Sequence, residues 1–327
     1  MPVPCRRALL RAAALLPLAK PALAQGGSFP SARPVRLVVG SAPGGAADIM
    51  GRVLAEGLSA AFPRGITVEN RTGAGGNLAA EAVARAAPDG YTLLLIDNAM
   101  IGINPVMFRQ ISFDPANDFT PIAHVGDFPF LFVVEPSVPA TTLNEFAAWA
   151  RAQRDPVLFA SPNPGSPHHL GMEMVAQRMG FRVSHVGFRG GAPAVAALLG
   201  GQMRVGSIGL PPIVALLREG RLRAVAISGP ERSPLAPDVP TLAEGGLAGL
   251  SLTVWFGIAG PRGLPPDVVR LTAAALQEAM ARPDVAQRLS AQGLTPRFMP
   301  PETFDAFMAA ERTRWGDAAR AANVTVD

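Results

Sequence analysis

Strand-like and helix-like segments alternate through most of this chain, and the alternation restricts it to a few folds. Residues 35–39 are an apolar strand, and apolar residues at helical spacing follow from Ile49 to Phe62. Because a strand–helix–strand order places successive strands side by side and parallel, the pattern predicts parallel sheets with helices on both faces. We expect strands at residues 35–39, 66–69, 91–96, 131–134, 157–160, 183–188, 203–208, 223–228 and 253–259, and helices at 49–62, 77–87, 143–152, 168–179, 193–199, 213–218, 266–281, 284–292 and 301–321.

These segments form two α/β units, followed by one more strand and helices that need a sheet to cover. The length of 327 residues also suits two domains. The economical arrangement returns the C-terminal part to the first unit. Domain 1 would then comprise residues 25–129 and 251–327, and domain 2 residues 130–250. Two crossings, near 128–131 and 249–253, would form a hinge, and ligands usually bind between such domains at the C-terminal ends of strands.

The first 24 residues are typical of a secretory signal peptide. They contain four bases and no acid, an apolar stretch at 12–18 and a small-x-small end at Ala22-Leu23-Ala24. A short amphipathic first helix is disfavoured, because glycines and prolines follow at once. The pair Arg6-Arg7 leaves both the general and the twin-arginine export routes open. We therefore expect a soluble, exported mature protein, located in the periplasm after removal of residues 1–24.

The composition excludes several classes of function. The formal charge of +4 lies entirely in residues 1–24, so the mature chain is formally neutral and has no electrostatic reason to bind nucleic acid. The single cysteine, Cys5, rules out a disulfide scaffold and cysteine-based metal sites. Lys20 is the only lysine, so a phosphate-binding loop that ends in Gly-Lys is absent from the mature chain.

Four glycine-rich junctions connect strands to helices, two in each predicted domain. They lie at residues 41–48, 71–77, 161–169 and 188–193. Glycines let backbone N–H groups approach a ligand, and helix starts offer unpaired N–H donors at the positive end of the helix dipole. Such junctions suit a carboxylate or another small anion. On spacing alone, an ordinary tight turn with Asp48 in the first helical turn explains the first junction equally well.

The sequence also contains residues that could form a metal site or the active site of a hydrolase. His168, His169, Glu173 and His185 contain metal-binding groups, but no H-E-x-x-H pattern occurs and the two adjacent histidines point in different directions on a helix. Ser166 could be a hydrolase nucleophile, but it has no evident base and no G-x-S-x-G elbow surrounds it. We expect no catalytic residue, no metal and no cofactor, and therefore not an enzyme.

Ten motifs, in conserved order and spacing from about residue 33 to about 320, resemble the Bug family of periplasmic receptors. This family comprises the substrate-binding (TctC-like) proteins of tripartite tricarboxylate transporters. The motifs are Arg33-Pro34-Val35-Arg36, Ala42-Pro43-Gly44-Gly45, Val68-Glu69-Asn70-Arg71 continuing to Asn77, Pro88-Asp89-Gly90-Tyr91, Ile103-Asn104-Pro105, Phe113-Asp114-Pro115, Gly165-Ser166-Pro167, Phe188-Arg189-Gly190, Leu199-Gly200-Gly201-Gln202 and Pro240-Thr241-Leu242.

The resemblance implies a two-domain periplasmic-binding-protein fold, type II-like, that closes on a small carboxylate. In the family the carboxylate is held by backbone amides, small hydroxyls and ordered waters rather than by a guanidinium. The implied ligand-binding residues are Pro43, Gly44, Gly45, Asp48, Gly75 and Gly76 in domain 1, and Ser161, Gly165, Ser166, His169, Arg189 and Gly190 in domain 2.

The implied function is capture of a di- or tricarboxylate, or another organic acid, by a monomeric receptor. The receptor would deliver its ligand to the membrane permease subunits of a tripartite tricarboxylate transporter. An orphan sensor that feeds a two-component kinase is the alternative, and an exported hydrolase is a minor one.

The chain departs from the family pattern at several positions. Ala46 stands where the family has Ser or Gly, and the segment from Asp97 to Met100 stands where small hydroxyl residues are usual. Arg204 and Ile208 occupy two positions where the family has acids. Loss of an acid disfavours an amino-acid ligand, because an ammonium group would need it. Asp97 would replace that charge if it faced the cleft.

Overall fold

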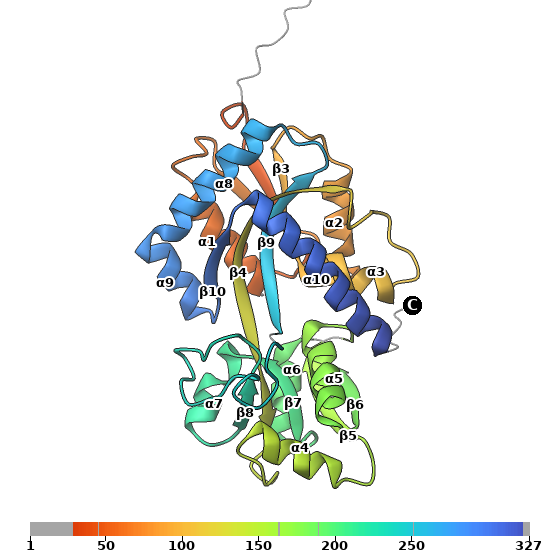
Figure 1. Ribbon diagram of the computed structural model, residues 1–327. Helices are drawn as coiled ribbons and strands as arrows, with labels where there is room; N and C mark the ends of the chain where they lie inside the picture. Colours follow the sequence, from red (N-terminus) through yellow and green to blue (C-terminus); the bar gives the residue numbers. More distant parts are fainter. Residues whose placement is uncertain (1–28, 45, 163, 189, 251, 323–327) are drawn as a thin grey trace, which may run out of the picture.

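The computed structural model describes residues 29–44, 46–162, 164–188, 190–250 and 252–322. The expected signal peptide at residues 1–24, and Cys5 within it, lie outside the described residues. Figure 1 shows two α/β lobes stacked along one long strand. We call them the first lobe, which contains β1–β3, β9 and β10, and the second lobe, which contains β5–β8.

The first lobe is built on a mixed sheet. Its three parallel strands are β1 (Val35–Val39), β2 (Ile66–Asn70) and β3 (Thr92–Asp97), with β1 in the middle. Next to β3 runs β9 (Thr253–Pro261), antiparallel, followed by β4 (Phe119–Val134) and β10 (Thr295–Met299), each antiparallel to its neighbour. The parallel arrangement of the first three strands confirms the expectation from their alternation with helices.

The second lobe repeats the design on a smaller scale. Its strands are β5 (Val157–Pro162), β6 (Val183–Phe188), β7 (Val205–Gly209) and β8 (Arg223–Ile227). β5 lies parallel to both β6 and β7, and β7 and β8 flank the end of β4 in antiparallel pairing.

One strand, β4, belongs to both sheets. Its first part pairs with β9 and β10, and its last residues, from Phe130 to Val134, pair with β7 and β8 (Figure 1). The strand expected at 131–134 is therefore only the end of a 16-residue strand. Pro121 and Pro129 concealed the rest, because proline gives up a backbone donor and is uncommon inside sheets. Pairing with β9 is irregular just after Pro121.

Helices cover both faces of both sheets. In the first lobe, α1 (Ala46–Gly57), α8 (Pro266–Ala281) and α9 (Pro283–Ala291) pack on one face, and α2 (Asn77–Ala84) and α10 (Pro301–Ala321) on the other. In the second lobe, α4 (Leu143–Arg151) and α5 (Pro167–Met179) lie opposite α6 (Gly191–Leu199) and α7 (Val214–Arg218). The short helical segments are η1 (Ala74–Gly76), η2 (Ala99–Ile103), α3 (Asn104–Met107) and η3 (Pro211–Ile213).

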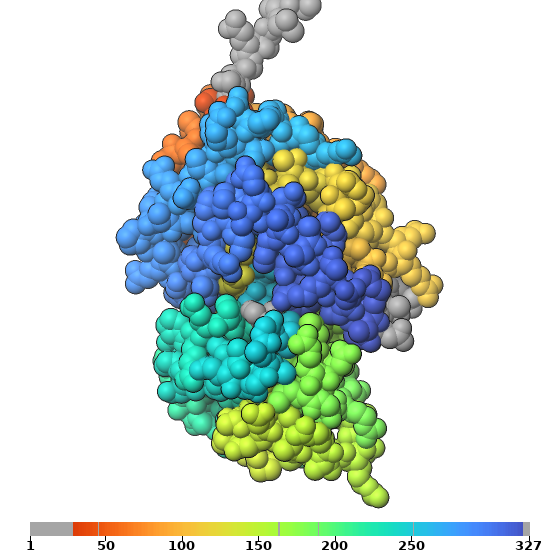
Figure 2. All heavy atoms as spheres, in the orientation of Figure 1, coloured from red at the N-terminus to blue at the C-terminus, as the bar shows by residue number. Residues whose placement is uncertain are grey.

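The two lobes touch through side chains as well as through β4. Trp315 near the end of α10 and Met107 at the end of α3 belong to the same apolar cluster as Phe130 and Leu170 of the second lobe. Figure 2 shows the lobes meeting at a narrower waist. The exact domain boundaries, at 129/130 and 250/251, stay a prediction. Within the part of the chain that the structure describes, no helix is both long and apolar enough to cross a membrane.

Candidate functional site

Strand directions place the glycine-rich junctions of both lobes opposite one another. β1, β2 and β3 run in the same direction as β4, because β9 lies antiparallel to both β3 and β4. In the second lobe β7 and β8 run antiparallel to β4, and β5 and β6 run parallel to β7. The C-terminal ends of β1–β3 therefore point toward the second lobe, and those of β5–β8 point toward the first. Ligands of α/β proteins bind at such strand ends.

The first junction is held in shape by Asp48, at the start of α1. Its buried carboxylate accepts hydrogen bonds from the Gly44 backbone N–H (2.9 Å), from Arg52 Nε (3.0 Å) and from Asn70 Nδ2 (2.9 Å). The Arg52 guanidinium is the main reason why the pKa of Asp48 falls to about 2. Both oxygens of Asp48 thus fix the loop, while Pro43 and Gly44 lie exposed in front of it. Gly45 lies outside the described residues.

The second junction depends on close backbone packing. Gly75 and Gly76 have φ angles of +64° and +96°, a region that L-residues rarely adopt. A Cβ on Gly76 would lie 2.7 Å from Met100 Cε of η2. Asn104 Nδ2 donates to the Gly75 carbonyl (3.0 Å) and to Asn77 Oδ1 (2.7 Å). These contacts fix the start of α2 against η2 and α3.

The third junction brings together three of the predicted residues at the start of α5. Ser166 is the N-cap: its Oγ accepts the His169 N–H at 3.3 Å and donates to the Pro162 carbonyl. The Gly165 N–H donates to His169 Nδ1 at 3.0 Å, so this nitrogen carries no proton in the neutral ring. His169 Nε2 lies 3.8 Å from Glu173 Oε1. Ser166 has a capping role here, and among the described residues no imidazole ring forms a hydrogen bond with its hydroxyl that would activate it.

His185 supports this junction from β6. Its ring stacks on His169 with centroids 3.7 Å apart, and its Nε2 lies 2.8 Å from the Oγ of the fully buried Ser161. Burial, and secondarily the neighbouring His169, lower the pKa of His185 to about 3. A histidine with this pKa is a weak general base for Ser161. His168 points elsewhere, as expected: it packs on Phe130, and burial lowers its pKa to about 4.

At the fourth junction, Gly190 is the N-cap of α6 with a φ angle of +106°, and Arg189 beside it lies outside the described residues. Among the side chains that the structure describes, no group of three His, Cys, Asp or Glu residues could hold a metal ion.

Three buried oxygens that sequence reasoning missed lie within or just after the strands that carry these junctions or their neighbours. They are Ser41 Oγ after β1, Asn98 Oδ1 after β3 and Ser207 Oγ on β7, and none has a hydrogen-bond partner among the described residues. Buried polar atoms normally have a partner, so these oxygens suit a polar ligand. Gly206 of β7 pairs with Ala160 of β5. Ser207 and Ser161 are the next residues on these two parallel strands, so the two serines lie side by side. Only the strand register could have revealed this.

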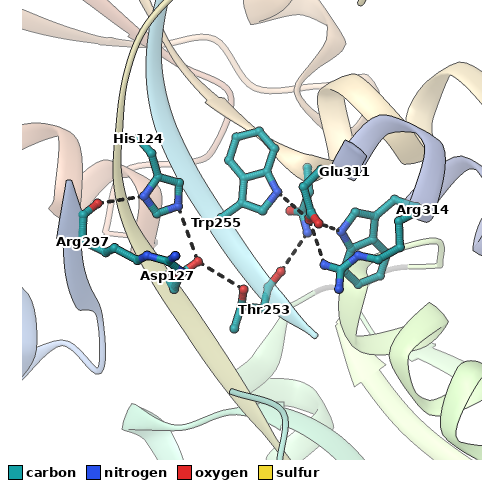
Figure 3. A network of polar contacts seen from close by, with 9 residues as sticks. His124, Asp127, Thr253, Trp255, Arg297, Glu311 and Arg314 are labelled. Atoms are coloured by element: carbon teal, nitrogen blue, oxygen red, sulfur yellow. Dashed lines mark hydrogen bonds and ion pairs between the residues drawn. The ribbon is translucent and has the colours of Figure 1, made fainter. Parts of the chain in front are cut away.

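The strands that cross between the lobes are linked by a polar network, shown in Figure 3. Thr253 Oγ1 on β9 donates to Asp127 Oδ1 on β4 at 3.2 Å, and His124 Nε2 lies 3.4 Å from the same oxygen. Arg297 of β10 lies 3.8 Å from the other Asp127 oxygen. Asn98 Nδ2, just after β3, donates to the Thr253 carbonyl at 2.9 Å. The end of β3 is thus connected directly to the crossing.

A second part of this network ties α10 to β9. The buried Glu311 Oε2 accepts from Trp255 Nε1 (2.9 Å), from Trp315 Nε1 (2.9 Å) and from an Arg314 guanidinium nitrogen (2.8 Å) (Figure 3). Trp255 lies on β9 and Trp315 packs against the second lobe. Glu311 therefore joins the crossing strand to the part of α10 that touches the other lobe.

Comparisons with known proteins agree with this arrangement. Residues 50–324 match the model of TctC, the tripartite tricarboxylate transporter family receptor. BugT of Bordetella pertussis is 34% identical over 290 residues, which cover 88% of this chain and 89% of that protein. A solved R. palustris protein with adipate is 29% identical with a TM-score of 0.79, covering 91% of this chain and 99% of that one. MatC from Rhodopseudomonas palustris with bound malate is 33% identical with a TM-score of 0.75, covering 89% of this chain and 100% of that one.

The solved structures show the fold class expected from the sequence, a two-domain binding-protein fold, and they include periplasmic binding proteins. With a family match over most of its length and a relative above 30% identity, this chain belongs to the TctC family of solute-binding receptors, the family of the Bug proteins.

Proposed function

We propose that this chain is a periplasmic receptor that captures a small organic acid between its lobes, performs no covalent chemistry, and delivers the acid to the permease of a tripartite tricarboxylate transporter. The observation that carries the proposal is the direction of the strands: the glycine-rich starts of α1 and α2 lie at the end of the first lobe nearer the second lobe, and those of α5 and α6 lie at the end of the second lobe nearer the first. Helix starts with accessible N–H donors favour anions. The relatives solved with adipate and malate make a carboxylate the favoured anion.

Binding by both lobes would favour the closed form. A ligand shifts a conformational equilibrium only by the difference between its contacts in the two states. An acid that touches the junctions after β1 and β2 as well as those after β5 and β6 makes all its contacts only when the lobes are close. The crossing of β4 and β9, where Asp127 and Thr253 are hydrogen-bonded, would then act as the hinge.

Charge and export support the same function. The positive charge of the full chain lies in residues 1–24, which have the pattern of an export signal. The rest of the chain is formally neutral. Attraction of an anion would therefore come from the local dipoles of the helix starts and from N–H groups such as those near Gly44 and Gly190, and net charge would contribute little.

A panel of carboxylates tests the proposal on the purified mature chain. The acids are succinate, malate, adipate, glutarate, citrate and 3-phenylpropionate, each added in excess to ligand-free protein. An acid at 100 times its Kd stabilises the native state by about 2.7 kcal/mol, which raises Tm by roughly 5–10 °C. Absence of any shift across the panel would reject the carboxylate-receptor proposal.

A matched pair of glycine variants locates the site. Gly44 and Gly263 have φ angles of +81° and +82°, both are exposed, and a Cβ on either would meet no atom within 4 Å. Gly44→Ala and Gly263→Ala should therefore cost similar stability. Gly263 lies past the end of β9, at the edge away from the second lobe. We expect calorimetry to show at least fivefold weaker binding for Gly44→Ala alone. Equal affinities of the two variants would remove the first junction from the site.

A further inference from the structure

Asp97 is a carboxylate at the end of the first lobe that lies nearer the second lobe. It ends β3, which lies between β1 and β9 in the sheet. Side chains two residues apart on a strand share a face, and Leu95 packs in the core under α1. Asp97 therefore faces the side of the sheet on which α1 and the first glycine-rich junction lie. Val39 pairs with Leu95, and the buried, unpartnered Ser41 Oγ lies two residues beyond Val39.

The surroundings of Asp97 differ from those of the other acids near the junction of the lobes. Asp48, Asp127 and Glu311 each accept hydrogen bonds from side-chain donors. Among the described side chains, none forms an ion pair with Asp97, which accepts the backbone N–H of Met100 at 2.9 Å. Burial raises its pKa to about 6, and no charged group contributes to that shift. An ionised carboxylate in such a place is a cost to folding unless something else uses it.

The local structure does not require the charge. The hydrogen bond from the Met100 N–H closes the turn that leads into η2, whose N-cap is the next residue, Asn98. The side-chain oxygens of Asn and Ser accept such backbone N–H bonds as well as Asp does. A partly buried carboxylate with a perturbed pKa, placed at a cleft, is a candidate for a functional role.

We propose that Asp97 selects ligands that carry a protonated amine beside their carboxylate. This inference rests on the proposed function: the ligand carboxylate would occupy the helix starts, and its ammonium group would bind Asp97. An ammonium group has three donors and an ionised carboxylate only acceptors, so the two match. Ser41 Oγ offers a second acceptor nearby. Ile208 of β7 is fully buried in the core beneath α6, so the second lobe offers no charge at that position.

Pairs of acids that differ only by an α-amino group test this inference. The pairs are aspartate and succinate, glutamate and glutarate, 2-aminoadipate and adipate, and phenylalanine and 3-phenylpropionate. In calorimetry at pH 7.5, we expect the amino acid of the bound pair to bind the wild-type protein at least tenfold more tightly than its partner. In Asp97→Ser and Asp97→Asn, which keep an acceptor for the Met100 N–H and lose the charge, the ratio should fall to near one. Unchanged or tighter binding of the partner acid by the variants shows that the site is intact.

The pH dependence gives an independent readout. Protonation of Asp97 between pH 7.5 and 5 should weaken wild-type binding of the amino acid severalfold and leave both variants unaffected. Other groups near the cleft do not mimic this effect. Asp48, paired with Arg52, stays ionised because its pKa is about 2. His168 and His185 stay neutral, because their pKa values are about 4 and 3. His169 and Glu173 of the second lobe are the same in the wild type and in the variants, so the comparison between them isolates the effect of Asp97.

The outcomes separate this inference from the proposed function. If a dicarboxylate or monocarboxylate binds at least as tightly as its amino counterpart, and Asp97→Ser does not change the ratio, the selective role of Asp97 is wrong and the receptor function stands. If acid binding strengthens at low pH only when Asp97 is present, a protonated Asp97 donates to the ligand and the amine assignment is also wrong. If no member of any pair binds, both the receptor function and the role of Asp97 are wrong.

Discussion

At the scale of single residues, Asp48 and Asp97 show how differently two aspartates at neighbouring strand ends can be used. Asp48 receives donors from Arg52, Asn70 and a backbone N–H, and its pKa falls to about 2. Its ionised form stabilises the fold above the pKa of an unfolded aspartate. Asp97 accepts the Met100 N–H but has no cation among the described residues, and its pKa rises to about 6. Its ionised form therefore opposes folding.

Asp97→Asn should stabilise the protein in a pH-dependent way. The native state binds the Asp97 proton more tightly than the unfolded state, whose aspartate has a pKa near 3.8. The cost of the charge is therefore full above pH 6 and vanishes below about pH 4. We expect Asp97→Asn to raise Tm by roughly 2–4 °C at pH 8, as a gain of about 1 kcal/mol would, and to leave Tm unchanged near pH 3.5. Thermal denaturation at both pH values measures this, and an equal effect at the two values would contradict it.

Individual residues also show which parts of the candidate site could be predicted from the sequence and which could not. Gly44, Gly75 and Gly190 were assigned to strand ends because the strand–helix alternation is a local pattern, and the structure places each one there. The neighbours Ser161 and Ser207, and the stack of His185 on His169, depend on which strands pair and in which register. Register is set by long-range packing, and no local pattern in one sequence encodes it.

At the scale of elements, most strands and helices were predictable and the exceptions have physical reasons. The first part of β4 contains Pro121 and an irregular pairing, and both break the alternation that identifies a strand. β10 is a short edge strand with Pro296 in it, and it pairs with β4 through only a few residues. Its strand character comes from its neighbour, so its own composition gives little sign of it.

Helix α10 depends on Glu311 for its attachment to β9. Glu311→Gln should lower stability by about 1.5–3 kcal/mol, the usual value of hydrogen bonds to a charged group, because two indole N–H groups and Arg314 share one carboxylate oxygen. We expect Tm to fall by several degrees, because an amide oxygen accepts these hydrogen bonds more weakly than a carboxylate. The tryptophan fluorescence should shift to the red as the looser packing of α10 admits water to the indoles near Glu311. Thermal unfolding and emission spectra measure both.

Asp317→Asn is the matched control for this variant. Asp317 lies on the same helix, is exposed, and pairs with Arg320 on the surface. Exposed pairs contribute little to stability, so this control should leave Tm and the fluorescence unchanged. Equal effects of the two substitutions would show that Glu311 has no special role in holding α10.

At the scale of the whole molecule, the two lobes share structure at three places. β4 runs through both sheets, the end of α10 packs in the core of the second lobe, and a Cβ on Gly165 would lie 2.0 Å from Met107 of the first lobe. The polar network around Asp127 and Thr253 links the crossing strands themselves (Figure 3). The lobes are therefore not independent bodies joined by a flexible linker.

We expect the protein to unfold in one cooperative transition. Loss of β4 would remove a central strand from both sheets at once, so neither lobe should survive the unfolding of the other. In scanning calorimetry the calorimetric and van't Hoff enthalpies should agree, and a bound acid should shift the whole transition. Two resolved transitions, with only one moved by the ligand, would contradict this expectation.

The shared strand β4 also has a consequence for how the chain matures. β4 is apolar and almost wholly buried in the native state, and all four of its strand partners follow it in the sequence, β10 near the end of the chain. During synthesis, β4 therefore emerges with both edges unpaired, and unpaired apolar strands favour aggregation. The sheet of the second lobe has all its strands once β8 ends at Ile227, but the sheet of the first lobe lacks β9 and β10 until the chain is almost finished, so folding of the first lobe must wait for them. A holding chaperone that masks β4 until then would protect the protein at its most vulnerable stage.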